Sequence, residues 1–219
     1  LDKPHFYEYQ YAFENERLMF FETGFSYEQY SSPPRALYSY VQNLVLRAPD
    51  NLLPVLQFNR TSLRINWFKN NFPDVLHVFL LRNPINQFES YLQRGKLGKN
   101  VFLAINMIII NKNRDVFGDI LAENILVDGG GGIVHDLESA MDASKLLTIK
   151  EHYCLFLHIW FRSLIEAQEH ADLLLDIDKL GSSMDYANDL EKIFLDYGVS
   201  VDFHDFNQKV YDKLSLSYN

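Results

Sequence analysis

Arg82 and Ser90 stand eight residues apart and are well suited in type to bind a phosphate group. An arginine guanidinium forms paired hydrogen bonds with phosphate oxygens, and a serine hydroxyl adds a further donor. Asn86 lies four residues before Ser90 and would share its face of a helix. These three residues are therefore the candidates for a clamp that holds an anionic group such as a phosphate.

The residues around Arg82 predict the strand and the helix that would position this clamp. Val75 to Leu81 is almost wholly apolar and rich in branched residues, which is typical of a strand buried on both faces of a parallel sheet. Pro84 suits the first turn of a helix. Arg82 would then lie at the carboxyl end of a strand, where ligands of open α/β sheets bind. Because Ser90 lies nearly two turns into the helix, the phosphate must lie beside the helix rather than on its N-terminus.

Further strands and helices follow from periodicity and from helix-breaking residues. Pro54 to Asn59 reads as a strand, Thr61 to Asn71 as a helix that ends before Pro73, and Arg94 to Lys99 as a loop. The other expected elements are a helix opened by Ser31–Pro34, a buried helix over Val101–Asn113, a long helix over Ile149–His170, a strand over Asp172–Ile177, and a helix over Ala187–Tyr197 capped by Gly198.

Three segments together resemble one family. Arg82-Asn83-Pro84 followed by Ser90 resembles the 3′-phosphate-binding segment of sulfotransferases that use 3′-phosphoadenosine-5′-phosphosulfate (PAPS). Pro54–Arg60 with Trp67-Phe68 resembles the preceding strand and helix of bacterial members, and Ala171–Leu180 resembles a later strand. The resemblance implies an α/β fold of three layers, a mostly parallel sheet flanked by helices, with the P-loop-NTPase-like topology of sulfotransferases.

The resemblance also implies ligands and their residues. PAPS would be the co-substrate, and its product adenosine 3′,5′-bisphosphate would bind at Arg82, Ser90, Asn86 and Arg60. The Pro-Lys-Ser-Gly-Thr-Thr type loop with which the family binds the 5′-phosphosulfate has no counterpart in this sequence. We therefore expect residues 1–219 to form a single sulfotransferase-like domain that lacks its N-terminal strand, loop and helix. The chain is then a piece of a longer protein or a degenerate family member, and it should bind PAPS poorly by itself.

Sulfuryl transfer also needs a base for the acceptor hydroxyl. Many cytosolic sulfotransferases place a histidine where this chain has Asn59, which cannot take a proton. The resemblance instead points to Glu8 as the catalytic base, with His5 in reserve. His77, inside the apolar strand, is expected to be a core residue with its hydrogen bonds satisfied. The remaining candidates on the long helix are His152 and His158.

Composition limits the partners. The chain carries a net charge of −9, which argues against nucleic acid as a ligand. An anionic co-substrate then requires a locally basic site. Lysines and arginines do gather in one part of the chain, although several are equally well explained as solvated surface residues: Arg60, Arg64, Arg82, Arg94, Lys96 and Lys99.

The histidines, the single cysteine and the apolar runs of the sequence predict a cytoplasmic protein without a bound metal. No histidine or cysteine spacing suggests a metal site, and no apolar run is long enough to span a membrane. The single cysteine, Cys154, excludes an internal disulfide framework and fits a reducing compartment. Its apolar neighbours predict a buried, inert thiol. The run Gly129–Gly132 lacks the lysine and hydroxyl residues of a phosphate loop, so a surface loop is the better interpretation.

Three functions remain open. The first is a sulfotransferase acting on a small-molecule, carbohydrate or carrier-bound hydroxyl or amine. The second is a non-catalytic binding or scaffold protein on the same fold. The third is another nucleotide-dependent transferase, including one that uses a nucleotide sugar. The sequence does not identify the acceptor.

Overall fold

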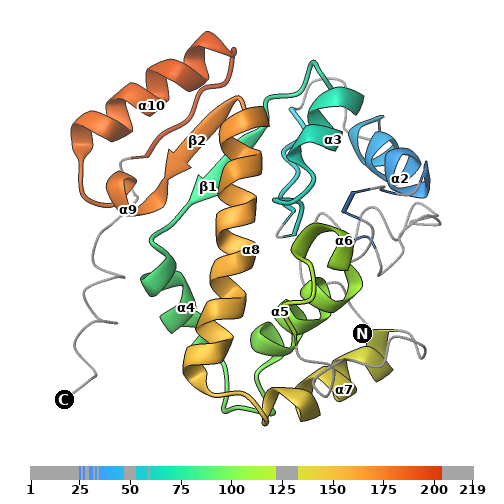
Figure 1. The fold of residues 1–219 in the computed structure, drawn as a ribbon. Helices are drawn as coiled ribbons and strands as arrows, with labels where there is room; N and C mark the ends of the chain where they lie inside the picture. The colour runs from blue at the N-terminus through green and yellow to red at the C-terminus, as the bar shows by residue number, and fades with distance from the viewer. Residues whose placement is uncertain are drawn as a thin grey trace, which may run out of the picture.

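The computed structural model describes residues 25, 27, 30, 31, 33, 35–46, 53–58, 60–121 and 133–203. In this part of the chain, helices surround a small sheet of two parallel strands, which lies between the long helix α8 and helix α10 (Figure 1). The fold is therefore a helix-rich α/β arrangement. None of its described helices is both long and apolar enough to cross a membrane.

Both strands lie within segments that the sequence predicts. Strand β1 (Val78–Leu81) pairs in parallel with β2 (Leu173–Asp176), so that Val78 faces Leu173 and Leu81 faces Asp176. Strand β1 is shorter than the expected Val75–Leu81, and the prediction that both of its faces are buried is wrong. Val75 is 42% exposed and Leu80 is 51% exposed. Val75 lies before the start of β1, and among the described residues β1 pairs with one strand, β2.

The prediction of a strand at Pro54–Asn59 is also wrong. Residues 53–58 have no regular secondary structure, and residue 59 lies outside the described residues. Leu53 is 63% exposed and Val55 is 84% exposed. An apolar run forms a strand only where another strand satisfies its backbone groups, and no described strand pairs with this segment.

The helices predicted around the sheet are present. Helix α3 (Ile65–Asn71) ends at Phe72, just before Pro73, and α4 (Pro84–Leu92) begins at the expected proline. Helix α5 (Val101–Lys112) is buried along most of its length. Helix α8 (Ile149–His170) has the predicted bounds, and Thr148 and Glu151 close its start with a capping box.

The remaining helices complete the described part of the chain. Helix α10 starts three residues before the predicted Ala187, because the Ser183 side chain accepts from the Tyr186 amide and caps it there. Gly198, at φ 76°, follows its end as predicted. The elements are α2 (Arg35–Leu46), α6 (Arg114–Phe117), α7 (Ile133–Ser144), α9 (Ile177–Leu180) and α10 (Met184–Asp196).

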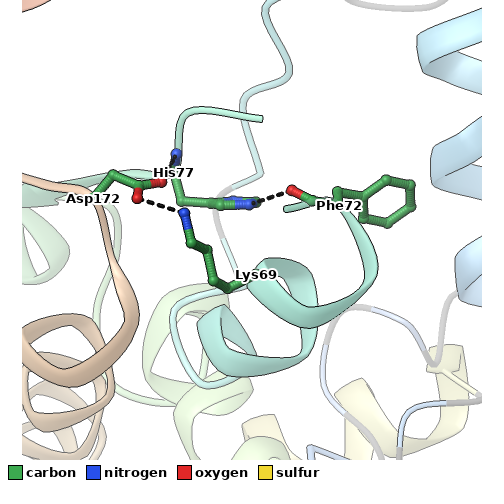
Figure 2. Close-up of polar contacts among 4 residues, drawn as sticks. All are labelled: Lys69, Phe72, His77 and Asp172. Carbon is green, nitrogen blue, oxygen red and sulfur yellow. Dashed lines mark hydrogen bonds and ion pairs between the residues drawn. The ribbon is translucent and has the colours of Figure 1, made fainter. Parts of the chain in front are cut away.

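A polar network ties α3 to the beginning of both strands (Figure 2). Asp172 accepts hydrogen bonds from the Lys69 ammonium at 2.5 Å and from the His77 backbone amide at 2.9 Å. The His77 ring donates from Nε2 to the Phe72 carbonyl at 3.0 Å. Burial alone would raise the pKa of Asp172, but the hydrogen bonds from Lys69 and His77 hold it below its ordinary value of 3.8. His77 is thus satisfied as expected, although it lies just before β1 rather than within it.

Candidate functional site

The candidate site lies at the opposite end of the sheet, where β1 leads into α4. Arg82 directly follows β1 and is half-buried. Its backbone carbonyl accepts a hydrogen bond of 3.2 Å from the Trp160 indole on α8. Arg82 therefore lies at the carboxyl end of a parallel strand, as predicted, in a turn that α8 holds in place.

The N-terminus of α4 is already satisfied by groups of the protein. The Asn83 side chain accepts from the amides of Ile85 at 2.9 Å and of Asn86 at 3.5 Å. The Asn83 amide donates to the Asp178 carboxylate at 2.5 Å. Pro84 has no amide hydrogen. An anion bound by this turn would therefore lie beside α4, which is the position that the spacing of Arg82 and Ser90 predicts.

Asn86 and Ser90 both have partners within the protein. Asn86 is exposed, and its side-chain amide lies 3.5 Å from Asp178 Oδ1. The half-buried Ser90 donates its hydroxyl proton to the Gln87 carbonyl at 2.6 Å. A phosphate at this face would need the Ser90 hydroxyl to turn away from its own helix. Asn86 and Ser90 therefore lie on one helix that follows Arg82, as predicted, and the Ser90 hydroxyl already donates to a carbonyl of that helix.

Asp178 is a residue of this edge that the sequence reasoning missed. It belongs to α9, directly after β2, and reaches the start of α4 because β1 and β2 run in parallel. Its carboxylate caps the α4 turn and places a negative charge beside the candidate clamp. The one sequence signal for Asp178 was its position directly after an expected strand. The pairing of two strands so far apart in the chain leaves no pattern in the sequence around Asp178.

Arg64 is buried rather than solvated. Its side chain is 1% exposed, its Nη1 donates to the Phe25 carbonyl, and its guanidinium lies 4.5 Å from the centre of the Tyr30 ring. Burial lowers the pKa of Arg64, and Tyr30 partly opposes that effect. The alternative of a solvated helix face is therefore wrong for Arg64, because this residue precedes α3 and is turned into the protein.

Arg60 lies in a turn before α3, not at the end of a strand as expected. It is half-buried, and burial lowers its pKa, while the nearby Tyr30, Tyr91 and Tyr27 oppose that effect. The three basic residues that follow α4 do not lie in the interior. The connection between α4 and α5 is a loop, as predicted, and its basic residues are exposed: Arg94, Lys96 and Lys99.

The candidate bases are only partly described. Glu8 and His5 lie outside the described residues, as does the run Gly129–Gly132. His152 is 1% exposed and its ring donates from Nε2 to the Ser144 carbonyl at 3.0 Å; burial lowers its pKa. These contacts give His152 a structural role within the helix packing. His158, by contrast, is exposed on α8 and is the accessible histidine of the pair.

The expectation of a buried Cys154 is wrong, because its thiol is exposed on α8. The buried residues of that helix follow a face that excludes position 154: His152, Leu155, Phe156, Ser163 and Ala167. Within the described ranges, no group of three or more histidine, cysteine, aspartate or glutamate side chains could hold a metal ion.

Comparison with known proteins gives no relative: no family model, no curated protein and no solved structure matches the chain.

Proposed function

We propose that this chain is the nucleotide-binding part of a PAPS-dependent sulfotransferase. The observation that carries the proposal is the succession of β1, a half-buried Arg82 and the capped helix α4 with Ser90. The 3′-phosphate of PAPS would lie beside α4, between the Arg82 guanidinium and the Asn86 and Ser90 side chains. Arg60 would contribute a second positive charge.

The arrangement of the sheet supports the same proposal. Two parallel strands among helices are compatible with an α/β architecture, and we propose that they belong to the three-layer, P-loop-like fold of this family (Figure 1). In such sheets the carboxyl ends of the strands form the ligand site. The full sheet would include the phosphosulfate-binding strand and loop, and Glu8 would be the base that accepts the proton of the acceptor hydroxyl or amine.

A non-catalytic scaffold on the same fold is the second candidate, and one observation favours it. The Asp178 carboxylate and the Ser90–Gln87 hydrogen bond both stand where a phosphate would have to compete with groups of the protein. Both contacts can be replaced without unfolding a helix, since Asn83 caps α4 independently through its side chain. We therefore place the enzyme first.

Replacement of Arg82 tests the proposal. Arg82→Ala removes a charge-assisted hydrogen bond to the 3′-phosphate, so it should weaken adenosine 3′,5′-bisphosphate binding by about 1.5–3 kcal/mol, or roughly 10- to 150-fold in Kd. Isothermal titration calorimetry measures this change. Arg114→Ala is the matched control, because Arg114 is an exposed arginine on α6 that pairs with Asp119 at 3.5 Å. Equal affinity in Arg82→Ala and the control would refute the assignment.

A further inference from the structure

Five basic side chains gather where α4 leads into α5 and where α7 leads into α8. Residues 93–102 contain three cations and no carboxylate, and residues 141–151 contain two cations and two carboxylates. All five basic side chains are exposed: Arg94, Lys96, Lys99, Lys145 and Lys150. These two segments, the basic end of the molecule, therefore carry a net charge of +3 on a chain whose net charge is −9.

Direct contacts join the two segments of the basic end. The Gly98 backbone amide donates to Ser144 Oγ at 3.0 Å. A Cβ added to Gly98 would lie 2.5 Å from Lys145 Cε, so the lysine stem passes directly over this glycine. Both segments lie at the N-terminal end of α8 (Figure 1), about 33 Å along this 22-residue helix from the end that leads into β2. The five cations therefore belong to one surface, away from the sheet.

Aliphatic side chains lie between these cations. Leu146 is 66% exposed, Ile149 is 52% exposed and Leu97 is 37% exposed. Each of the three is adjacent to a lysine in the sequence. Exposed aliphatic groups gain free energy when they enter the boundary between the headgroups and acyl chains of a bilayer, and basic side chains beside them are attracted to anionic headgroups. The basic end thus combines the two features that bind proteins to a lipid surface.

The two carboxylates of the basic end are engaged by groups of the protein. Asp142 Oδ1 lies 2.5 Å from Lys145 Nζ in an ion pair. The Glu151 carboxylate accepts from the Thr148 amide and from the Thr148 hydroxyl, both at 2.7 Å. The surplus positive charge therefore lies on the segment that connects α4 with α5.

We propose that the basic end docks on the surface of a membrane that contains anionic lipids. Its cations contact the lipid headgroups, while Leu97, Leu146 and Ile149 enter the boundary between headgroups and acyl chains. A nucleic acid fits this surface less well, because its one aromatic ring, Phe102, already stacks on Tyr91 with centroids 5.0 Å apart. An acidic peptide would match the charge but would leave the aliphatic side chains without an apolar partner. The inference goes beyond the proposed function and does not rest on it.

Sedimentation with lipid vesicles tests the inference. The partition coefficient of the protein is measured on vesicles of phosphatidylcholine alone and on vesicles of phosphatidylcholine with phosphatidylserine. The wild type should bind the anionic vesicles at least about tenfold more strongly than the neutral ones. A protein with a net charge of −9 is repelled by anionic lipid as a whole, so this preference requires a local positive surface.

Two double variants separate the basic end from positive charge in general. Lys96→Gln with Lys99→Gln removes two exposed cations of the basic end, and should lower the partition coefficient on anionic vesicles about tenfold or more. Arg162→Gln with Lys192→Gln removes two exposed cations further along α8 and on α10. This control should stay within about twofold of the wild type, because charges beyond a Debye length of about 8 Å are largely screened. Leu146→Ser keeps every charge and should lower the partition coefficient several-fold, because it removes an aliphatic side chain that enters the bilayer.

Three results would overturn the inference. They are a wild type that does not bind the anionic vesicles, equal losses in the two double variants, and an unchanged partition coefficient in Leu146→Ser. A wild type that binds a glutamate-rich peptide but not the vesicles belongs to the first case, and would assign the basic end to a protein partner instead. None of these measurements involves a nucleotide or Arg82, so the proposed function is judged separately.

Discussion

At the scale of single residues, Asp172 links α3 to the start of both strands (Figure 2). Its pKa is lowered in the folded protein, so its contribution to stability is present above the ordinary value of 3.8 and is lost as the pH falls through the lower folded value. Asp172→Asn should therefore decrease the free energy of unfolding at pH 7 by about 0.5–1.5 kcal/mol. The difference from the wild type should shrink as the pH falls below about 4.

Urea unfolding at several pH values checks this prediction. The control is Asp189→Asn, because Asp189 and Lys192 form an ion pair of 3.1 Å in which both side chains are mostly exposed. Such a pair contributes little, so the control should differ from the wild type by less than about 1 kcal/mol at every pH. If the two variants behave alike, the network at the strand starts does not stabilise the fold as described.

At the scale of secondary-structure elements, Asn100 holds the ends of two helices together. Its side-chain amide donates to the carbonyls of Tyr91 at 2.7 Å and Gly95 at 3.1 Å, while its oxygen accepts from the amides of Phe102 and Leu103. Asn100→Asp keeps the acceptor but removes both donors and places a carboxylate against two carbonyl oxygens. Because the side chain is fully buried, the free energy of unfolding should decrease by about 1–3 kcal/mol or more.

Chemical denaturation of Asn100→Asp and Ser183→Asp measures that effect. Ser183 caps α10 by accepting from the Tyr186 amide, and an aspartate carboxylate accepts in the same way, so aspartate can replace it there with a change within about 0.5 kcal/mol. Similar losses in both variants would mean that the donors of Asn100 contribute little, and that the α4–α5 connection is held by packing alone.

The elements also show which structural features a sequence reveals. Helix α4 was predictable because Pro84 suits a first helical turn, and helix α8 because its apolar residues recur at helical spacing. The structure of the segment Pro54–Phe58 was not predictable from its sequence. An apolar segment forms a strand only if another strand pairs with it, and composition does not show such pairing. Cys154 was misjudged because apolar neighbours do not show which side of a helix faces the core.

The candidate site was likewise predictable only where its residues are adjacent in the sequence. The end of β1, the start of α4 and the position of Arg82 follow from residues adjacent in sequence. Asp178 reaches Asn83, and Arg64 reaches Phe25 and Tyr30, only through the folded chain. Such contacts between distant segments leave no local pattern, so the acidic neighbour of the clamp and the buried arginine were not foreseen.

At the scale of the whole molecule, the proposed function requires an acidic protein to bind an acidic nucleotide. The chain carries a net charge of −9, and Asp178 adds negative charge next to the α4 turn. Under the proposed function, selective binding would therefore depend on Arg82 acting at short range, since the overall field repels the ligand. The preference for a nucleotide that carries a 3′-phosphate is the property that separates a sulfotransferase site from a general nucleotide site.

The most direct test of that claim is the ratio of two dissociation constants, for adenosine 5′-monophosphate and for adenosine 3′,5′-bisphosphate, measured by calorimetry on the same protein. The two ligands differ in the 3′-phosphate alone. We predict that the wild type binds the bisphosphate at least about tenfold more tightly, and that Arg82→Ala reduces this ratio toward one. A wild-type ratio near one, or a ratio unchanged in Arg82→Ala, would contradict the account.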